Sequence, residues 1–205
     1  MKGNLITFEG VDGSGKSTLI AALKKYLDQH NIDCIVTREP GGLPLCEDVR
    51  SIVKYSTQKI SPKAEFLLFS ASRAELVQDF ILPNLAMGKI VLCDRFFDSS
   101  RVYQGYAKNI DDSEIMAVTN FATNGLKPAK TFLLDIDPVV AFKRKGGQEV
   151  GDRIEQQGIA YHQKVRQGYL KIAKNDDRFV VLDATKPVTE LLNEIVATLK
   201  KESII

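Results

Sequence analysis

The sequence predicts an α/β fold with a doubly wound parallel sheet, and three observations lead to this class. Five short apolar runs alternate with longer stretches whose apolar residues recur at helical spacing. A glycine-rich turn follows the first apolar run and leads into the first helical pattern. The chain has 205 residues, of which 44% are hydrophobic and 26% charged, as in soluble globular proteins. We therefore expect one domain over residues 1–205.

The composition argues against several classes of protein. The net charge of +2 is too small for the basic field of an obligate nucleic-acid binder. The three cysteines are odd in number and are not clustered with the two histidines, which fits a reducing compartment without a zinc site. The N-terminal apolar stretch is too short for a signal peptide, and no run is long enough to span a membrane. We expect a cytoplasmic protein with neither a nucleic-acid nor a membrane partner.

The predicted elements follow one another along the whole chain. Strands are predicted at residues 5–8, 33–37, 89–93, 131–136 and 179–182. Helices are predicted at residues 19–27, 47–54, 64 to about 82, 111–121, 154–173 and about 188–200, with another starting at Asp137-Pro138. Pro83 should end the long third helix because proline lacks the N–H that a helix needs. Cys34 and Cys93 fall in strands and are expected to be buried, inert thiols.

The first strand and helix are joined by a motif of the form G-x-x-x-x-G-K-[ST]. Its glycines allow a backbone whose N–H groups converge on a phosphate at the positive end of a helix. The lysine would reach the β- and γ-phosphates, and the first hydroxyl would bind Mg²⁺. The alternative is a glycine-rich turn that only starts a helix. The context favours a nucleoside triphosphate site formed by Gly10, Val11, Asp12, Gly13, Ser14, Gly15, Lys16, Ser17 and Thr18.

Charged residues also follow the second and third strands, at the edge of a parallel sheet where ligands bind. Arg38, Glu39 and Pro40 follow the second strand, where a substrate would lie, although an arginine beside an acid is also a common surface pair. Asp94 ends the third strand and is a candidate ligand of Mg²⁺. Arg95, beside it, would face the transferring phosphates.

Three further stretches carry candidate site residues. Phe69 and Arg73 lie four apart on the long helix, where Phe69 alone would fit core packing, but a guanidinium on that face needs a partner. Polar side chains cluster at residues 98–105 and include Ser99, Ser100, Tyr103 and Gln104. Residues 143–153 combine positive charge with glycines, which predicts a mobile lid over phosphates or, alternatively, a solvated charged segment.

Taken together, these stretches resemble the bacterial type of thymidylate kinase over nearly the whole chain. The matching segments are FEGVDGSGKST at 8–18, TREPGG at 37–42, AEFLLFSASRAE at 64–75, ILPNLAMGKIVLCDRF at 81–96, DSSRVYQG at 98–105 and GDRIE at 151–155. The resemblance implies a P-loop kinase fold with a five-stranded parallel sheet in the order 2-3-1-4-5, flanked by helices. It also implies a homodimer that transfers the γ-phosphoryl group of Mg²⁺·ATP to dTMP, giving dTDP and ADP for dTTP biosynthesis.

The resemblance also implies roles for single residues. Arg38, Arg50 and Arg95 match basic ligands of the acceptor phosphate. Phe69 matches the aromatic ring that stacks on thymine, and Arg73 matches the guanidinium that hydrogen-bonds it. Further matches are Ser100 and Gln104 near the base edge, Tyr103 under the sugar, Asp12 near the 3′-hydroxyl and Mg²⁺, and residues 184–187, with Lys186, beside adenine.

The predicted lid departs from one branch of the family. That branch carries an arginine in the P-loop, whereas this chain has Gly13 and Ser14. The catalytic arginine should then come from the lid, which offers Arg144 and Arg153. Lysines stand where further arginines would be common, and a lysine lacks the bidentate fork.

Two other functions are compatible with a P-loop. A kinase of the same fold could act on another monophosphate or on a nucleoside. A GTPase switch would need the N-K-x-D guanine motif, which this sequence lacks. A non-catalytic relative is disfavoured because Lys16, Ser17, Asp94 and Arg95 are all present.

Overall fold

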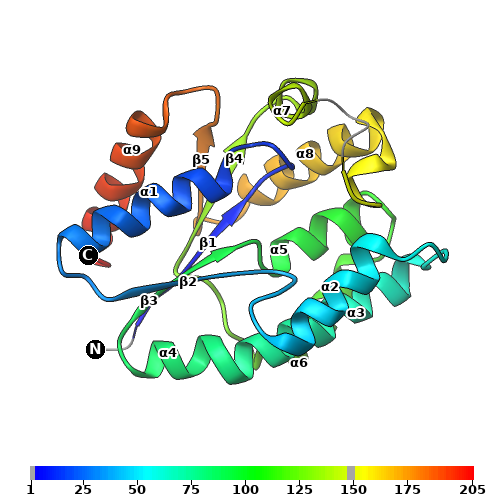
Figure 1. Ribbon diagram of the computed structural model, residues 1–205, viewed down its shortest axis with the longest axis horizontal. Helices are drawn as coiled ribbons and strands as arrows, with labels where there is room; N and C mark the ends of the chain where they lie inside the picture. Colours follow the sequence, from blue (N-terminus) through cyan, green and yellow to red (C-terminus); the bar gives the residue numbers. More distant parts are fainter. Residues whose placement is uncertain (1–2, 147–150) are drawn as a thin grey trace.

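A computed structural model describes residues 3–146 and 151–205 and confirms the predicted fold class (Figure 1). Its strands are β1 (Leu5–Glu9), β2 (Cys34–Arg38), β3 (Ile90–Asp94), β4 (Lys130–Asp135) and β5 (Phe179–Asp183). All strand pairs are parallel, and the order is β2-β3-β1-β4-β5. The central strand β1 is buried over all five residues, which include the polar side chains Thr7 and Glu9 as well as three apolar ones.

Helices cover both faces of this sheet (Figure 1). Helices α1 (Lys16–Gln29) and α9 (Val188–Lys201) pack against each other, and α8 (Ile159–Ala173) packs on β4 and β5. The remaining α-helices are α2 (Pro44–Tyr55), α3 (Pro62–Leu76), α4 (Leu82–Ala86), α5 (Phe97–Ser100), α6 (Asp112–Thr123) and α7 (Pro138–Arg144). Because every strand is parallel, the carboxyl ends of all five meet at one edge, and this edge carries the site.

Helix α3 ends at Leu76, before the predicted end, but the helical stretch continues past Pro83, so the prediction that Pro83 stops it is wrong. A π-helical turn, Val77–Ile81, follows α3 and leads into α4. Pro83 therefore stands in the first turn of α4, where a missing N–H breaks no helical hydrogen bond.

The helix predicted at 154–173 begins five residues later than expected. Residues Glu155–Gln157 form a 3₁₀ turn, and Gly158, with φ 86°, separates this turn from α8. Asp152 organises the turn by accepting hydrogen bonds from the backbone N–H groups of Ile154 and Glu155 at 2.9 and 3.1 Å. The polar cluster at 98–105 is also helical, as α5 and the π-helical turn Arg101–Tyr106.

The cysteines agree with the sequence-based expectation of buried thiols. Cys34, Cys46 and Cys93 are buried free thiols, and Cys34 and Cys93 lie in β2 and β3 as predicted. Across residues 3–146 and 151–205, no helix has the length and apolar character of a membrane span.

Candidate active site

The phosphate-binding loop, or P-loop (residues 10–18), connects β1 to α1. The first N–H groups of α1 have no side-chain cap. Gly13 has φ 80°, and a Cβ there would collide with the carbonyl oxygen of Ala141, so the turn requires glycine. Lys16 is 7% exposed, and its Nζ donates to the carbonyl oxygens of Gly10 and Val11, both at 3.2 Å. Burial and the nearby charge of Arg95 lower the pKa of Lys16. The loop thus combines free amides and one buried ammonium, a suitable cradle for phosphate oxygens.

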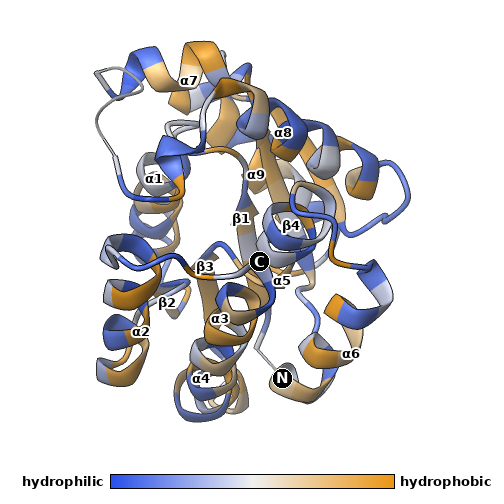
Figure 2. Ribbon diagram, turned by 90° about the vertical axis from the view of Figure 1, so that its right-hand side faces the viewer, coloured by the Kyte–Doolittle hydropathy of each residue, from blue (hydrophilic) through white to orange (hydrophobic). Residues whose placement is uncertain are grey.

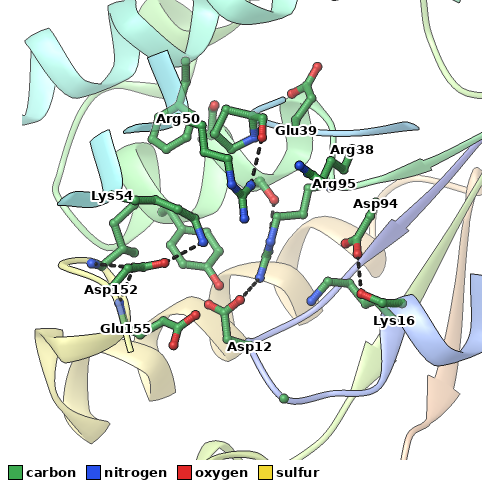
Figure 3. Close-up of a pocket in the computed structure, with 18 of the residues that line it drawn as sticks. Asp12, Lys16, Arg38, Glu39, Arg50, Lys54, Asp94, Arg95, Asp152 and Glu155 are labelled. Atoms are coloured by element: carbon green, nitrogen blue, oxygen red, sulfur yellow. Dashed lines mark hydrogen bonds and ion pairs between the residues drawn. The ribbon is translucent and has the colours of Figure 1, made fainter. Parts of the chain in front are cut away.

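Two hard oxygen donors meet beside this loop. The Ser17 hydroxyl, on the first turn of α1, donates to Oδ2 of Asp94 at 2.9 Å (Figure 3). Asp94 ends β3, next to β1 in the sheet, which is why residues 77 positions apart touch. Within the described residues no group of three or more His, Cys, Asp or Glu side chains forms a metal cage. A hydroxyl and one carboxylate suit Mg²⁺ that takes its other ligands from phosphates and water.

Arg95 follows Asp94 and holds the left-handed backbone angle φ 70°. Its guanidinium donates to Oδ1 of Asp12 at 2.9 Å and to the Ser99 hydroxyl at 3.2 Å. Burial alone would raise the pKa of Asp12, but Arg95 and Lys16 together hold it well below its usual range. The carboxylate of Asp12 therefore stays ionised in the same space as two cations.

Glu9, the last residue of β1, binds the Arg95-Phe96 turn that follows β3. It is fully buried and accepts hydrogen bonds from the Phe96 N–H, the Ser99 hydroxyl and the Tyr169 hydroxyl at 2.8, 2.7 and 2.6 Å. Burial raises the pKa of Glu9, while Arg95 opposes this effect. These bonds hold the Arg95-Phe96 turn to the sheet and to α8.

A second buried ion pair lies on the α3 side of the site. Nε of Arg73 donates to Oε2 of Glu39 at 2.8 Å, and Arg73 Nη2 donates to the Ser100 hydroxyl at 3.2 Å. Arg73 is 1% exposed, and its Nη1 has no hydrogen-bond partner within the described part of the chain. Burial raises the pKa of Glu39 to about 7, although Arg73 lowers it. An unpaired buried N–H donor beside the partly buried ring of Phe69 suits a flat polar ligand.

These groups line one cavity of about 680 Å³. Figure 3 shows Asp12, Lys16, Asp94 and Arg95 at one end and Arg50, Lys54, Asp152 and Glu155 at the other. The wall carries more lysine and arginine side chains than carboxylates, and Phe69 and Tyr103 add aromatic surface. A site of this composition fits two phosphate-bearing ligands.

A family model for thymidylate kinase matches residues 8–195. The chain belongs to the thymidylate kinase family. A thymidylate kinase from Thermoanaerobacter sp. (strain X514) is 44% identical over 202 residues, which cover 98% of this chain and 99% of the relative. One from Chlorobium limicola is 47% identical over 207 residues, covering 96% and 94%. The crystal structure of thymidylate kinase from Ehrlichia chaffeensis superposes with a TM-score of 0.79 at 33% identity, covering 97% of this chain and 99% of that one.

Most residues that the thymidylate kinase resemblance assigned lie together in the cavity. The lining includes Asp12, Gly13, Gly15, Lys16, Ser17, Thr18, Arg38, Glu39, Pro40, Arg50, Phe69, Arg73, Asp94, Arg95, Ser99, Ser100, Tyr103, Gln104 and Arg144. Gly10, Val11 and Ser14 belong to the loop backbone and do not line the cavity.

Arg153 and Lys186 lie outside the cavity lining. Nε and Nη2 of Arg153 donate to the carbonyl oxygen of Val53 at 3.0 and 2.8 Å, and Nη2 also pairs with Glu65. Lys186 is exposed and pairs with Glu194 at 2.7 Å. Residues 147–150 of the predicted lid at 143–153 lie outside the described residues.

Lys54 and Glu155, in the cavity lining, and Tyr169, which contacts Glu9 from outside the lining, were not among the residues assigned to the site from the sequence. Lys54 pairs with Asp152 at 2.6 Å, and Lys145 pairs with Glu155 at 2.6 Å, across the cavity wall. A signal for Lys54 exists, because it stands one helical turn after Arg50. Tyr169 offers no such signal, since it reaches Glu9 across 160 positions.

Proposed function

We propose that this protein transfers the γ-phosphoryl group of Mg²⁺·ATP to dTMP, giving dTDP and ADP. One observation supports it most: the P-loop and the Phe69-Arg73 pair open into the same cavity. A phosphate-binding loop alone would suit many reactions. An aromatic ring and an unpaired guanidinium N–H in the same cavity add a place for a planar base.

The donor would lie over the P-loop. Lys16 and the free amides of α1 would bind its phosphates, and Ser17 and Asp94 would hold Mg²⁺, which neutralises charge on the phosphate oxygens. Nη1 of Arg144 donates to the carbonyl oxygen of Ala184 at 2.9 Å, so Arg144 connects the cavity with residues 184–187, the proposed adenine side. Arg144 and Lys145 line the cavity and are the proposed lid cations, whereas Arg153 would fasten the lid to α2 and α3.

The acceptor would lie between β2, α2 and α3. Arg38, Arg50 and Arg95 would hold the monophosphate, Phe69 would stack on thymine, and Tyr103 and Asp12 would face the sugar. A phosphate monoester oxygen is already anionic at neutral pH, so the reaction needs no strong general base. These residues would align the two phosphate groups, neutralise their repulsion and exclude water from the transfer.

We also propose a homodimer through α2, α3 and α6. These helices stand side by side, with α3 in the middle, and Figure 2 shows hydrophobic segments along them. Their exposed apolar side chains are Leu45, Ile52 and Tyr55 on α2, Leu67 on α3 and Phe121 on α6, the last 87% exposed. Several large apolar side chains exposed on neighbouring helices are typical of a protein interface.

The proposed reaction can be tested by the choice of acceptor. ADP release with Mg²⁺·ATP is measured with dTMP, dUMP, dCMP, UMP, GMP, AMP and thymidine in separate reactions. The proposal predicts the highest kcat/KM for dTMP. Preference for another monophosphate would overturn the acceptor assignment and keep the P-loop chemistry, and inactivity with all seven would overturn both.

A further inference from the structure

Glu65 connects the cavity wall with Arg153, the last residue of the predicted lid, and no sequence motif assigns it a role. It lies in the first turn of α3, and its side chain is fully buried. Oε1 accepts hydrogen bonds from Nε2 of Gln104 at 2.8 Å and from Nζ of Lys108 at 2.6 Å. Oε2 pairs with Nη2 of Arg153. One carboxylate thus accepts hydrogen bonds from three donors on two segments, residues 104–108 and Arg153.

This contact fixes the orientation of the Gln104 amide. An ionised carboxylate can only accept hydrogen bonds, so the NH₂ end of the amide must face Glu65. Burial would raise the pKa of Glu65, but its hydrogen bonds with Lys108, Gln104 and Arg153 lower it, which keeps the carboxylate ionised. Gln104 lines the cavity, and within the described residues its Oε1 makes no hydrogen bond. The carbonyl end of the amide is therefore the end left for a ligand.

The position of Glu65 on α3 places this acceptor beside the proposed base site. Glu65, Phe69 and Arg73 are spaced four residues apart and follow one face of the helix. Phe69 and Arg73 line the cavity, and Nη1 of Arg73 is a buried donor without a partner in the described residues. The wall around Phe69 thus offers both an acceptor, Gln104 Oε1, and a donor, Arg73 Nη1.

We infer that Glu65 is a specificity-determining positioning residue, which holds Gln104 so that the pocket accepts a pyrimidine with an N–H at ring position 3. Thymine and uracil carry this N–H, whereas cytosine carries a bare acceptor nitrogen there. A cytosine would therefore place an acceptor against an acceptor and leave both unpaired. The inference rests on the proposed function and adds the residue that sets the base preference.

The double substitution Glu65→Gln/Lys108→Met tests this role because it should reverse the Gln104 amide. Oε1 of Glu65 faces both Gln104 and Lys108, and Oε2 faces Arg153. With Lys108 removed, the single side-chain oxygen of the glutamine faces Arg153, and the new NH₂ group faces Gln104, whose amide must rotate to offer its oxygen. The NH₂ of Gln104 would then point into the cavity, where it suits cytosine and opposes thymine.

The measurement is kcat/KM for dTMP, dUMP and dCMP on the same enzyme preparation. For Glu65→Gln/Lys108→Met, the ratio of dTMP to dCMP should fall by roughly tenfold or more, the usual effect of one mispaired buried hydrogen bond. The ratio of dTMP to dUMP should stay unchanged, because these bases differ only by a methyl group. Both ratios are independent of the concentration of active enzyme, so partial misfolding of a variant does not change them.

Three further variants complete the test. Glu114→Gln makes the same chemical change at an exposed carboxylate paired with Lys63 and should leave both ratios unchanged. Arg153→Gln removes the lid contact, keeps the contact between Glu65 and Gln104, and should preserve the ratio of dTMP to dCMP. If the double variant does not fold, Glu65→Gln/Lys108→Leu makes the same change with a shorter side chain at position 108. Both double variants remove one cation together with the carboxylate and keep the local charge balanced.

The inference is overturned if the ratio of dTMP to dCMP is unchanged in Glu65→Gln/Lys108→Met, or in Glu65→Gln/Lys108→Leu where that is the one that folds. It is also overturned if the ratios to dCMP and dUMP fall together, which a general loosening of the pocket would produce. Where turnover is too slow to measure, dissociation constants for the three nucleotides give the same ratios. Failure of the proposed function is a separate result, because the wild-type enzyme would then not turn over dTMP.

Discussion

Phe69 illustrates how one side chain can belong both to the core and to a ligand site. It packs against the main core cluster and also lines the cavity. Phe69→Ala is expected to raise KM for dTMP about tenfold with a smaller change in kcat, because stacking on the base is equal in the ground and transition states. Steady-state kinetics with Met87→Ala, an exposed apolar side chain at the end of α4, provides the control. An unchanged KM would leave Phe69 a core residue only.

Glu39 makes the stability of the protein depend on pH. Folding raises its pKa from 4.5 to about 7, mainly through burial, so the folded protein holds a proton that the unfolded chain releases. The stabilisation is complete below about pH 4.5 and is lost as the pH rises through 7, with about 3 kcal/mol as its upper limit. The free energy of unfolding in urea should fall more from pH 5 to pH 8 for the wild type than for Glu39→Gln. A difference between the two proteins that stays constant with pH would contradict this origin.

At the scale of elements, the turn between β1 and α1 depends on its packing against α7. The prediction is that Gly13→Ala lowers the free energy of unfolding by about 1–3 kcal/mol, since a Cβ would meet the Ala141 carbonyl at an unfavourable positive φ. Gly125→Ala is the matched control, because Gly125 has φ 71° with no atom within 4 Å of an added Cβ. Thermal unfolding of both variants separates the clash from the backbone strain. Equal losses would show that the contact with α7 does not matter.

Local sequence signals predicted the strands and the P-loop because their causes are local. The apolar runs indicated which segments are buried, and the glycine spacing indicated the phosphate-binding turn. The end of α3 was misplaced because the π-helical turn Val77–Ile81 moves Pro83 into a new first turn. The start of α8 was misplaced because Gly158 and Asp152 stabilise a separate 3₁₀ turn inside an apparently helical pattern.

Site residues whose role depends on distant partners were harder to predict. Phe69 and Arg73 share a helix face, which the sequence shows directly. Glu65 continues the same spacing by one turn, but its partners Gln104 and Arg153 are 39 and 88 positions away. The contacts of Arg153 with the Val53 carbonyl oxygen and with Glu65 likewise follow from the tertiary arrangement alone.

At the scale of the whole molecule, the apolar surface on α2, α3 and α6 predicts self-association. Phe121→Asp should convert a dimer into a monomer without unfolding it, because Phe121 is 87% exposed and contributes little to the core. Analytical ultracentrifugation of the wild type and the variant measures this directly. Met87→Asp, outside this surface, should remain dimeric. A monomeric wild type would refute the proposed dimer.

The central claim is that one cavity brings two phosphate groups together for direct transfer. Chromatographic separation of the products from dTMP and Mg²⁺·ATP tests it most directly. The account predicts dTDP and ADP in equal amounts, with no excess of inorganic phosphate, because water is excluded from the transfer. ADP and inorganic phosphate without dTDP would instead identify an ATPase and contradict the assignment of the acceptor site.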